Sequence, residues 1–352
     1  MPLAVEPLPP IRPLRTLREV LPVADLCSDL GKAVLGQEEA IETIVPYVEL
    51  FESGLAPEGR PGGVFLLLGP TGTGKTRTVE ALAKTLHGSE RNVLRVDCGE
   101  FQMEHEVAKL IGAPPGYLGH RETHPMLSQQ KLNAVSSERS PLSLVLFDEI
   151  EKAAASFARI LLGVLDRARL KLGDNTEVNF ESSLIFLTSN LGARGMMDEL
   201  GGGFGYPAEG RKPPKERQAK LSRIAMTEVR RRFSPEFVNR IDEIVTYHPL
   251  SHEALEGILD LQLNQIRSHI RSRLGPASFD LELSSRARKL LLAEGTSVEY
   301  GARELKRVIH RQLMQPLAKL IIGNEIPAGG LVRVDVDGRR AGLEFAALRK
   351  AA

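Results

Sequence analysis

One glycine-rich stretch constrains the fold of this chain more than any other feature. Residues 64–69, VFLLLG, are followed by GPTGTGKT at 69–76, which fits the pattern G-x-x-x-x-G-K-[ST]. The apolar run predicts a strand buried on both faces, and the residues after Thr76 predict a helix. A strand, a glycine turn and a helix in this order direct backbone N–H groups and a helix N-terminus toward a phosphate. A glycine-rich turn that matches by chance is the alternative.

Within this predicted phosphate loop each residue type has a role. The glycines allow consecutive N–H groups to surround phosphate oxygens, Lys75 supplies a charge to the outer phosphates, and the Thr76 hydroxyl can bind magnesium. The predicted nucleotide-binding residues are Gly69, Pro70, Thr71, Gly72, Thr73, Gly74, Lys75 and Thr76.

Three further apolar runs predict the rest of a sheet. They are NVLRVD at 92–97, LSLVLFDE at 142–149 and SLIFLTSN at 183–190, and stretches with helical periodicity separate them. Buried strands that alternate with helices predict an α/β fold with a central parallel sheet. Ligands of such sheets bind beyond the carboxyl ends of the strands, where the polar ends of these runs fall.

The chain divides into three predicted parts. Residues 1–15 are rich in proline and predict an extended tail. Residues 16–249 form the predicted large α/β nucleotide-binding unit. Residues 250–345 carry amphipathic helical patterns and one short strand, LVRVDVDG at 331–338, and predict a smaller, mostly helical unit.

The composition is that of a globular protein without a strong global charge. Hydrophobic residues make up 42% and charged residues 26%, and the formal net charge is +1. This balance argues against wholesale disorder and against a general attraction to nucleic acid or anionic membranes. No apolar run approaches the roughly 20 residues that cross a bilayer. Two cysteines exclude a disulfide scaffold, so we expect a cytoplasmic protein.

Two of the strand ends carry side chains suited to nucleotide hydrolysis. Asp148 can hold Mg²⁺, commonly through water, and Glu149 can act as a general base on an attacking water. Asn190 can orient that water with its amide. The alternatives are a solvated turn for the acidic pair and a simple turn or cap for Asn190.

The order of these motifs resembles a known family. GPTGTGKT, LVLFDEIEKA, LTSN, SPEFVNRIDE and YGARELKR follow one another as in AAA+ ATPases. More narrowly, they resemble the second ATPase ring of the Clp unfoldases and disaggregases, over about residues 30–338. The resemblance implies ATP and Mg²⁺ as cofactors and a homo-oligomeric ring, expected to be hexameric. It also implies that Leu35, Gly36 and Gln37, in VLGQEEAI, pack on the adenine.

Two arginines take roles only through this resemblance. Arg240, in NRID, corresponds to the arginine finger that reaches the nucleotide of a neighbouring subunit and stabilises charge on the transferred phosphoryl group. Arg303, in GARELKR, corresponds to the sensor-two arginine that ties the small unit to the nucleotide. A surface arginine paired with Asp242 or Glu243 is the alternative for Arg240, and a solvated arginine at a helix start is the alternative for Arg303.

The loop IGAPPGYLGH at 111–120 resembles the axial pore loop of these unfoldases. An aromatic between glycines grips a polypeptide through contact area without selecting its sequence. Tyr117 and Leu118 are therefore the implied substrate-binding residues, and an unfolded or tagged polypeptide is the implied substrate. A surface loop whose tyrosine fills a gap in the fold is the alternative.

In several places the chain departs from the family pattern. Only 68 residues precede Gly69, so we expect one ATPase module without the family's amino-terminal, first ATPase and middle domains. Phe204, in GGGFGY, lacks the hydrophobic neighbour of peptidase-docking loops, so a peptidase ring is only weakly indicated. His120 and His124 have a metal-compatible spacing, but no helix is expected there, and a metal site is disfavoured. The basic stretch 211–232 is interrupted by acids and favours a solvated helix face over nucleic acid.

The sequence therefore predicts an ATP-hydrolysing protein unfoldase or remodelling chaperone that threads polypeptide through a ring. Three other functions remain open: an ATPase that feeds a partner peptidase, a nucleotide switch that acts on nucleic acid, and a regulatory scaffold.

Overall fold

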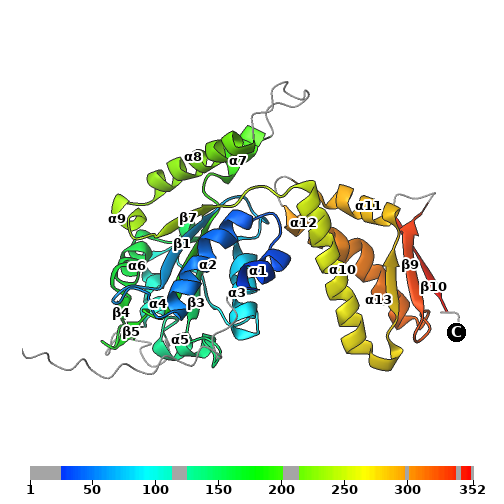
Figure 1. Ribbon diagram of the computed structural model, residues 1–352, viewed down its shortest axis with the longest axis horizontal. Coiled ribbons are helices and arrows are strands. Elements are labelled where there is room, and N and C mark those ends of the chain that lie inside the picture. The colour runs from blue at the N-terminus through cyan, green and yellow to red at the C-terminus, as the bar shows by residue number, and fades with distance from the viewer. Residues whose placement is uncertain (1–24, 113–124, 201–213, 298–300, 338–341, 350–352) are drawn as a thin grey trace, which may run out of the picture.

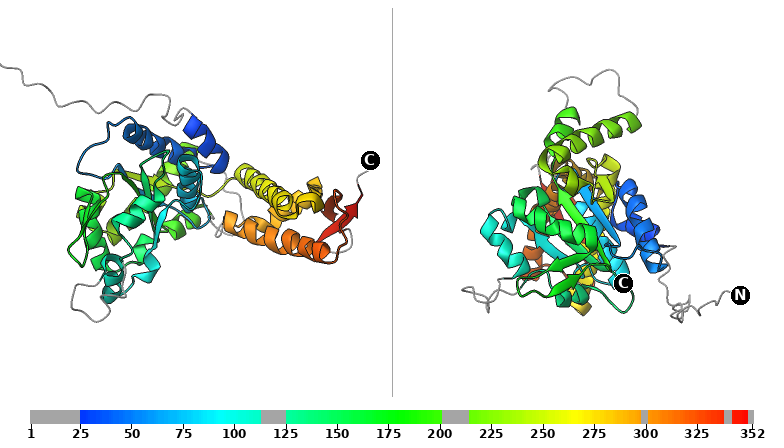
Figure 2. Two further views of the ribbon diagram at one scale, coloured as in Figure 1. Left: turned by 90° about the horizontal axis from the view of Figure 1, so that it is seen from below. Right: turned by 90° about the vertical axis from the view of Figure 1, so that its left-hand side faces the viewer.

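The chain folds into a layered α/β unit followed by a smaller helical unit (Figure 1). The computed structural model describes residues 25–112, 125–200, 214–297, 301–337 and 342–349 of the 352-residue chain. A central parallel sheet with helices on both faces and a mostly helical carboxyl-terminal part confirm the predicted fold class. Figure 2 shows the same two parts from below and from the side of the larger one.

All strands of the central sheet run parallel, in the spatial order β2-β3-β6-β1-β7. Their bounds are β1 (Gly63–Leu68), β2 (Leu94–Asp97), β3 (Ser143–Asp148), β6 (Ser183–Ser189) and β7 (Glu243–Thr246). The four predicted strands are confirmed. The edge strand β7 was not predicted because its four residues, EIVT, give too short an apolar pattern.

Alternate residues of the strands pack on opposite layers. Phe65 and Leu67 of β1 pack with one layer of helices, while Val64, Leu66 and Leu68 pack with the other. The first layer contains α1 (Leu26–Ala33), α2 (Glu38–Glu52) and α3 (Lys75–His87). All six residues of β1 are buried, as predicted for a strand covered on both faces.

The second layer contains the remaining helices of the large unit. They are α4 (Ala108–Ile111), α5 (Gln129–Val135), α6 (Ala155–Arg167), α7 (Ala193–Leu200), α8 (Pro214–Arg232) and α9 (Pro235–Val238), with 3-10 turns η2 (Cys98–Glu100), η3 (Glu104–Val107) and η4 (Ile150–Lys152). A hairpin of β4 (Arg169–Lys171) and β5 (Glu177–Asn179) follows α6. The helix α6 ends at Arg167, because Ala168 adopts a left-handed conformation and the chain turns into β4.

The carboxyl-terminal unit has its own core and its own sheet. It contains α10 (His252–Leu274), η5 (Gly275–Ala277), β8 (Asp280–Leu283), α11 (Ser285–Gly295), α12 (Ala302–Val308), the π-helix η6 (Ile309–Met314), α13 (Gln315–Ile322), β9 (Leu331–Val336) and β10 (Leu343–Leu348). The single predicted strand is β9, which pairs with β8 in parallel and with β10 antiparallel. None of the described helices combines the length and the apolar composition needed to cross a membrane.

The bend after β1 requires a glycine. Gly69 has φ +141°, and a Cβ there would overlap the backbone carbonyl oxygen of Tyr247, which cannot rotate away. Gly54 also has a positive φ, +76°, but a Cβ there meets no atom within 4 Å.

We therefore predict that Gly69→Ala lowers the free energy of unfolding by at least about 3 kcal/mol, the sum of backbone strain and overlap. The matched control Gly54→Ala costs about 1 kcal/mol because it introduces conformational strain alone. Urea denaturation of both variants measures the difference, and equal losses would contradict the close approach of Gly69 to Tyr247.

Candidate functional site

The predicted phosphate loop lies at the carboxyl edge of the central sheet. Gly69 continues β1, and its N–H donates to the carbonyl of Ser189 at the end of β6. The loop is braced internally, since the Thr73 hydroxyl donates to the carbonyl of Pro70 over 2.9 Å. The helix α3 begins at Lys75, so its N-terminus opens into the loop. The strand, loop and helix predicted from the sequence are confirmed in this arrangement.

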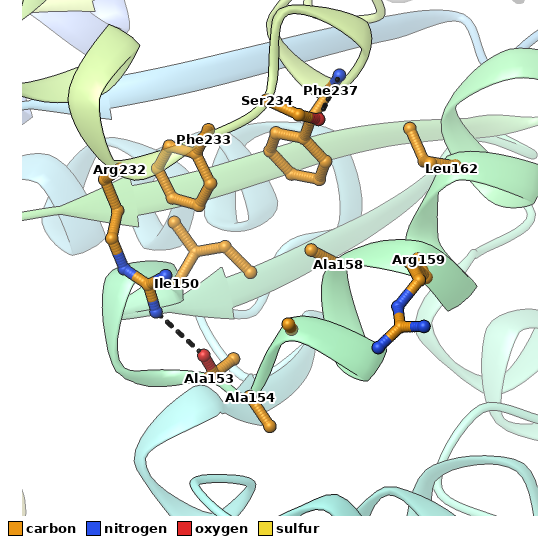
Figure 3. Close-up of a pocket in the computed structure, with 11 residues that line it drawn as sticks. Ile150, Ala153, Ala154, Ala158, Arg159, Leu162, Arg232, Phe233, Ser234 and Phe237 are labelled. Atoms are coloured by element: carbon orange, nitrogen blue, oxygen red, sulfur yellow. Dashed lines mark hydrogen bonds between the residues drawn. The ribbon is translucent and has the colours of Figure 1, made fainter.

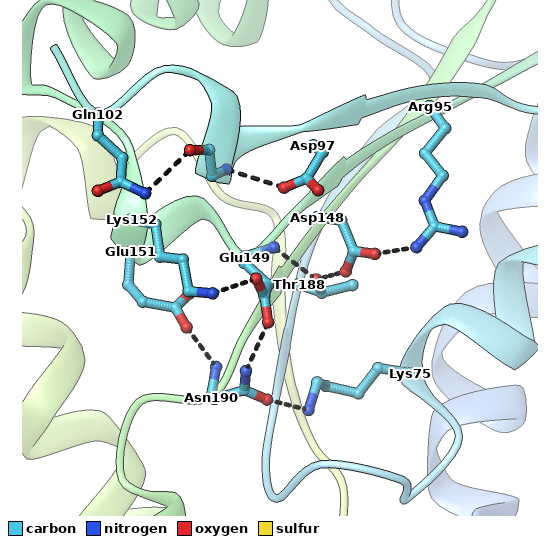
Figure 4. A network of polar contacts seen from close by, with 11 residues as sticks. Lys75, Arg95, Asp97, Gln102, Asp148, Glu149, Glu151, Lys152, Thr188 and Asn190 are labelled. Carbon is cyan, nitrogen blue, oxygen red and sulfur yellow. Dashed lines mark hydrogen bonds and ion pairs between the residues drawn. The ribbon is translucent and has the colours of Figure 1, made fainter. Parts of the chain in front are cut away.

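Lys75 is buried at the centre of the site (Figure 4). Its ammonium group donates to the carbonyls of Gly69, over 2.6 Å, and of Pro70, over 2.9 Å, and to Oδ1 of Asn190, over 2.9 Å. Burial lowers the pKa of Lys75 to about 8, against the attraction of the nearby Glu151 and Asp148 carboxylates. The ammonium is thus held by neutral oxygens of the loop, which a phosphate can replace.

The acidic pair ends β3 beside this lysine. Asp148 accepts hydrogen bonds from the Thr188 hydroxyl and from the Arg95 guanidinium, which also forms an ion pair with it. The N–H of Glu149 donates to the same Thr188 hydroxyl over 3.0 Å. Glu149 has φ +58°, a left-handed conformation that costs about 1–2 kcal/mol in a residue with a Cβ. The two neighbouring carboxylates therefore point in different directions, that of Asp148 toward Arg95 and that of Glu149 toward Asn190 (Figure 4).

Asn190 connects the lysine to the predicted base. Its Oδ1 accepts from Lys75, and its Nδ2 donates to Oε1 of Glu149 over 3.4 Å. The other carboxylate oxygen of Glu149 accepts from the Lys152 ammonium over 2.5 Å. The structure therefore brings together Lys75, Glu149 and Asn190, which the sequence assigned to one site.

Three partners in this network were missed by the sequence reasoning. Arg95 lies on β2, Thr188 precedes Asn190 by two residues, and Lys152 follows Glu149 by three. The spacing of Thr188 and Asn190 was the available signal, because residues two apart point to the same face of a strand. Arg95 carried no comparable signal.

The segment predicted to pack on adenine is fixed to the loop. Gln37 is buried, and its side-chain amide donates to the carbonyls of Thr73, over 3.1 Å, and His248, over 2.8 Å. The preceding residue Gly36 has φ +72° and lies so close to Ala254 that an added Cβ would be 2.9 Å from its side chain. This segment is therefore wedged between the loop and α10 of the small unit.

The small unit also touches the phosphate loop near Arg303. The N–H of Ala302, which starts α12, donates to the carbonyl of Gly72 over 3.1 Å. Gly301 makes this approach possible, because a Cβ there would be 2.9 Å from the same carbonyl oxygen. Arg303 follows in the first turn of α12, near enough to Lys75 to contribute to lowering its pKa.

Arg240 takes no part in this network and instead forms an ion pair with a residue of α6. Its Nε is 3.1 Å from Oδ1 of Asp166, near the end of α6. The two carboxylates considered in the sequence as alternative partners of Arg240 have other partners. Asp242 pairs with Arg60, and Glu243 accepts a hydrogen bond from the hydroxyl of Tyr47. The Arg240 side chain is 37% exposed.

The oxygen donors at the loop fit a magnesium ion. Thr76 offers a hydroxyl in the first turn of α3 and Asp148 a carboxylate at the end of β3, and Mg²⁺ prefers such oxygen ligands. Among the described residues there is no cluster of three or more histidines, cysteines or acids that could hold a metal on its own. The predictions for Tyr117 and Leu118, for Phe204, and for His120 and His124 fall outside the described residues.

A parallel sheet with a glycine-rich phosphate loop after its first strand defines a nucleotide-binding protein of the P-loop class. Comparisons with known proteins narrow the class. A family model described as "AAA domain (Cdc48 subfamily)" matches residues 60–244, and one described as "C-terminal, D2-small domain, of ClpB protein" matches residues 250–334. The chain belongs to the AAA ATPase family and, within it, to the Clp group.

Named relatives agree with this assignment. The chain is 38% identical over 320 residues to "Chaperone protein ClpB" of Corynebacterium diphtheriae, covering 91% of this chain and 34% of the relative. It is 36% identical to the ClpC ATP-binding subunit of a Clp protease from Staphylococcus saprophyticus, covering 88% and 36%. A solved complex of S. cerevisiae Hsp104 with casein matches with a TM-score of 0.78 at 30% identity, covering 95% and 54%. The chain thus spans about a third of the length of these curated relatives.

The lowered pKa of Lys75 predicts how nucleotide binding depends on pH. Below about pH 8 Lys75 of the unliganded protein is a charged ammonium group. Above this pH the group loses its proton, and with it the positive charge that binds a phosphate. We expect the Kd for ADP to be flat from pH 6.5 to 7.5 and to rise above pH 8, by at most about tenfold per pH unit.

Isothermal titration calorimetry across this range measures the effect. Lys75→Met serves as the control, since it should bind ADP weakly with no such rise. A Kd that stays constant up to pH 9.5 in the unsubstituted protein would contradict the assignment of Lys75 to the phosphates.

Proposed function

We propose that this chain is the ATP-hydrolysing module of a protein unfoldase or remodelling chaperone. The observation that carries the proposal is the connected path from Lys75 through Asn190 to Glu149, beside the phosphate loop. It joins a phosphate-binding cation, a water-orienting amide and a general base within one network. Membership in the Clp group supports the choice of this activity among those that P-loop proteins perform.

In this mechanism the side chains divide the chemistry. The loop N–H groups and Lys75 bind the phosphates of ATP, while Leu35, Gly36 and Gln37 hold the adenine. Thr76 and Asp148 would hold Mg²⁺, which neutralises charge on the phosphates when bound. Glu149 accepts a proton from the attacking water, which Asn190 orients.

Two arginines complete the proposed site from outside the loop. Arg240 reaches the terminal phosphate bound by the neighbouring subunit and stabilises the charge that develops on it, so hydrolysis depends on assembly. Arg303 ties the position of the small unit to the bound nucleotide, which the contact between Ala302 and Gly72 supports.

We further propose that the protein assembles into a hexameric ring in the cytoplasm and moves an unfolded polypeptide through its axial pore. Tyr117 and Leu118 are the residues assigned to grip the polypeptide. The solved Hsp104 complex with casein supports a polypeptide as substrate, since casein is bound to that relative. The division into a large unit ending at 249 and a small unit from 250 to 345 remains part of this proposal.

The general base is tested by Glu149→Gln. We expect this variant to bind ATP with unchanged affinity but to hydrolyse it at least about 100-fold more slowly, because an amide cannot accept the proton. The matched control is Glu104→Gln, an exposed glutamate on η3, which should retain turnover. Normal hydrolysis by Glu149→Gln would remove this residue from the catalytic role.

The substrate class is tested by steady-state ATPase assays with unfolded casein and, separately, with DNA. We expect casein to stimulate the unsubstituted protein and DNA to have no effect. Casein should no longer raise the ATPase rate of Tyr117→Ala. It should still raise the rate of Tyr117→Phe, because the aromatic surface remains.

Other outcomes assign the protein differently. Stimulation by DNA alone would favour a switch that acts on nucleic acid. If neither ligand stimulates, a regulatory scaffold becomes the better account.

A further inference from the structure

Glu151 joins the hydrolysis network to a distant part of the large unit. Its Oε1 accepts from the backbone N–H of Asn190 over 3.1 Å (Figure 4). Its own carbonyl accepts from Arg232, with Nε at 3.0 Å and Nη2 at 2.7 Å. The same guanidinium donates to the carbonyl of Ala153 over 2.9 Å (Figure 3). Arg232 therefore binds the backbone of the turn that directly follows Asp148 and Glu149.

Arg232 is also the last residue of α8 and begins the segment that carries Arg240. The rings of Phe233 and Phe237 stack at 5.0 Å, and the Ser234 side chain caps α9 by accepting from the Phe237 N–H. The N–H of Arg240 donates to the carbonyl of Phe237 over 3.2 Å. Residues 232–240, here called the finger segment, are thus internally braced.

The finger segment packs on the turn after β3 and on α6, since Phe233 and Phe237 share a hydrophobic core with Ile150. A cavity of about 210 Å³ that is partly open to solvent remains beside this contact, lined by Ile150, Ala158 and Leu162 on one side and by Phe233 and Phe237 on the other (Figure 3). The three hydrogen bonds of Arg232 bridge the two elements at one end of this cavity.

A second contact holds the far end of the finger segment. Asp166, near the end of α6, pairs with the Arg240 guanidinium over 3.1 Å. Since α6 is the direct continuation of the turn that Arg232 binds, the finger segment is attached near both ends of this one helix. A shift of Glu151 or of the turn would therefore displace Arg240 as well.

We propose that Arg232 is a positioning residue that couples each subunit's own hydrolysis site to the arginine it presents to its neighbour. This inference rests on the proposed function, which assigns Arg240 to the neighbouring nucleotide. A change at Asn190 and Glu149 on hydrolysis is transmitted through Glu151 and Arg232 to the finger segment. Hydrolysis in one subunit thereby alters the catalytic competence of the next.

A double-mutant cycle tests this coupling. The variants are Arg232→Met, Arg240→Ala and the combination, and Arg231→Met, an exposed arginine one residue earlier on α8, is the matched control. Single-turnover hydrolysis of ATP resolves slow rates, steady-state assays give KM and kcat, and light scattering gives the mass of the assembly.

We expect Arg232→Met to lower the rate about tenfold, as a misplaced catalytic group does, with KM and assembly mass unchanged. The combined variant should be no slower than Arg240→Ala alone, because Arg232 acts only through Arg240. Arg231→Met should match the unsubstituted protein. Arg232→Lys retains the charge but loses the planar guanidinium, so its rate should lie between those of Arg232→Met and the unsubstituted protein. This variant provides the test if Arg232→Met does not fold.

Each remaining outcome overturns the coupling in a recognisable way. Losses that multiply in the combined variant would show that Arg232 acts on its own site or on the fold, while the proposed function stands. An Arg232→Met rate equal to that of the unsubstituted protein would remove Arg232 from the reaction. An Arg240→Ala variant with normal turnover would refute the arginine finger itself, and with it the role of Arg232.

Discussion

The candidate site depends on the parallel pairing of β3, β6 and β1. Because these strands are neighbours that run in one direction, Asp148, Asn190 and Gly69 leave the sheet at the same edge. Residues that are separated by about 40 to 120 positions in the chain thereby form one network. A one-residue shift in the register of β6 would turn Thr188 away and break its hydrogen bonds to the Asp148 carboxylate and to the Glu149 N–H.

The network places a buried cation among neutral oxygens. The Lys75 ammonium is buried, which lowers its pKa, and loop carbonyls and the Asn190 amide hold it. Preorganised charge in a site with little water stabilises a phosphate more strongly than the same charge in solution. The hydrogen bond from the Ala302 N–H to the Gly72 carbonyl brings the small unit into direct contact with this loop.

How much could be predicted from the sequence differs from residue to residue. The phosphate loop, Asp148, Glu149 and Asn190 carry local signals, because each follows an apolar strand. Arg240 and Arg303 became candidates only through family resemblance, since an arginine in a helix or loop has many possible partners. Arg95, Thr188, Lys152 and Arg232 act through contacts that the fold creates. The strands β8 and β10 were also not predicted, because their short patterns indicate strands only once they are paired with β9.

In the proposed mechanism, hydrolysis requires two subunits, one that binds ATP and one that supplies Arg240. The most direct measurement is the ATPase activity per subunit over a wide range of protein concentrations, with the assembly mass determined in the same samples. We expect low activity in the monomer and a steep rise to a plateau as rings form. Activity per subunit that stays constant from monomer to ring would contradict this mechanism.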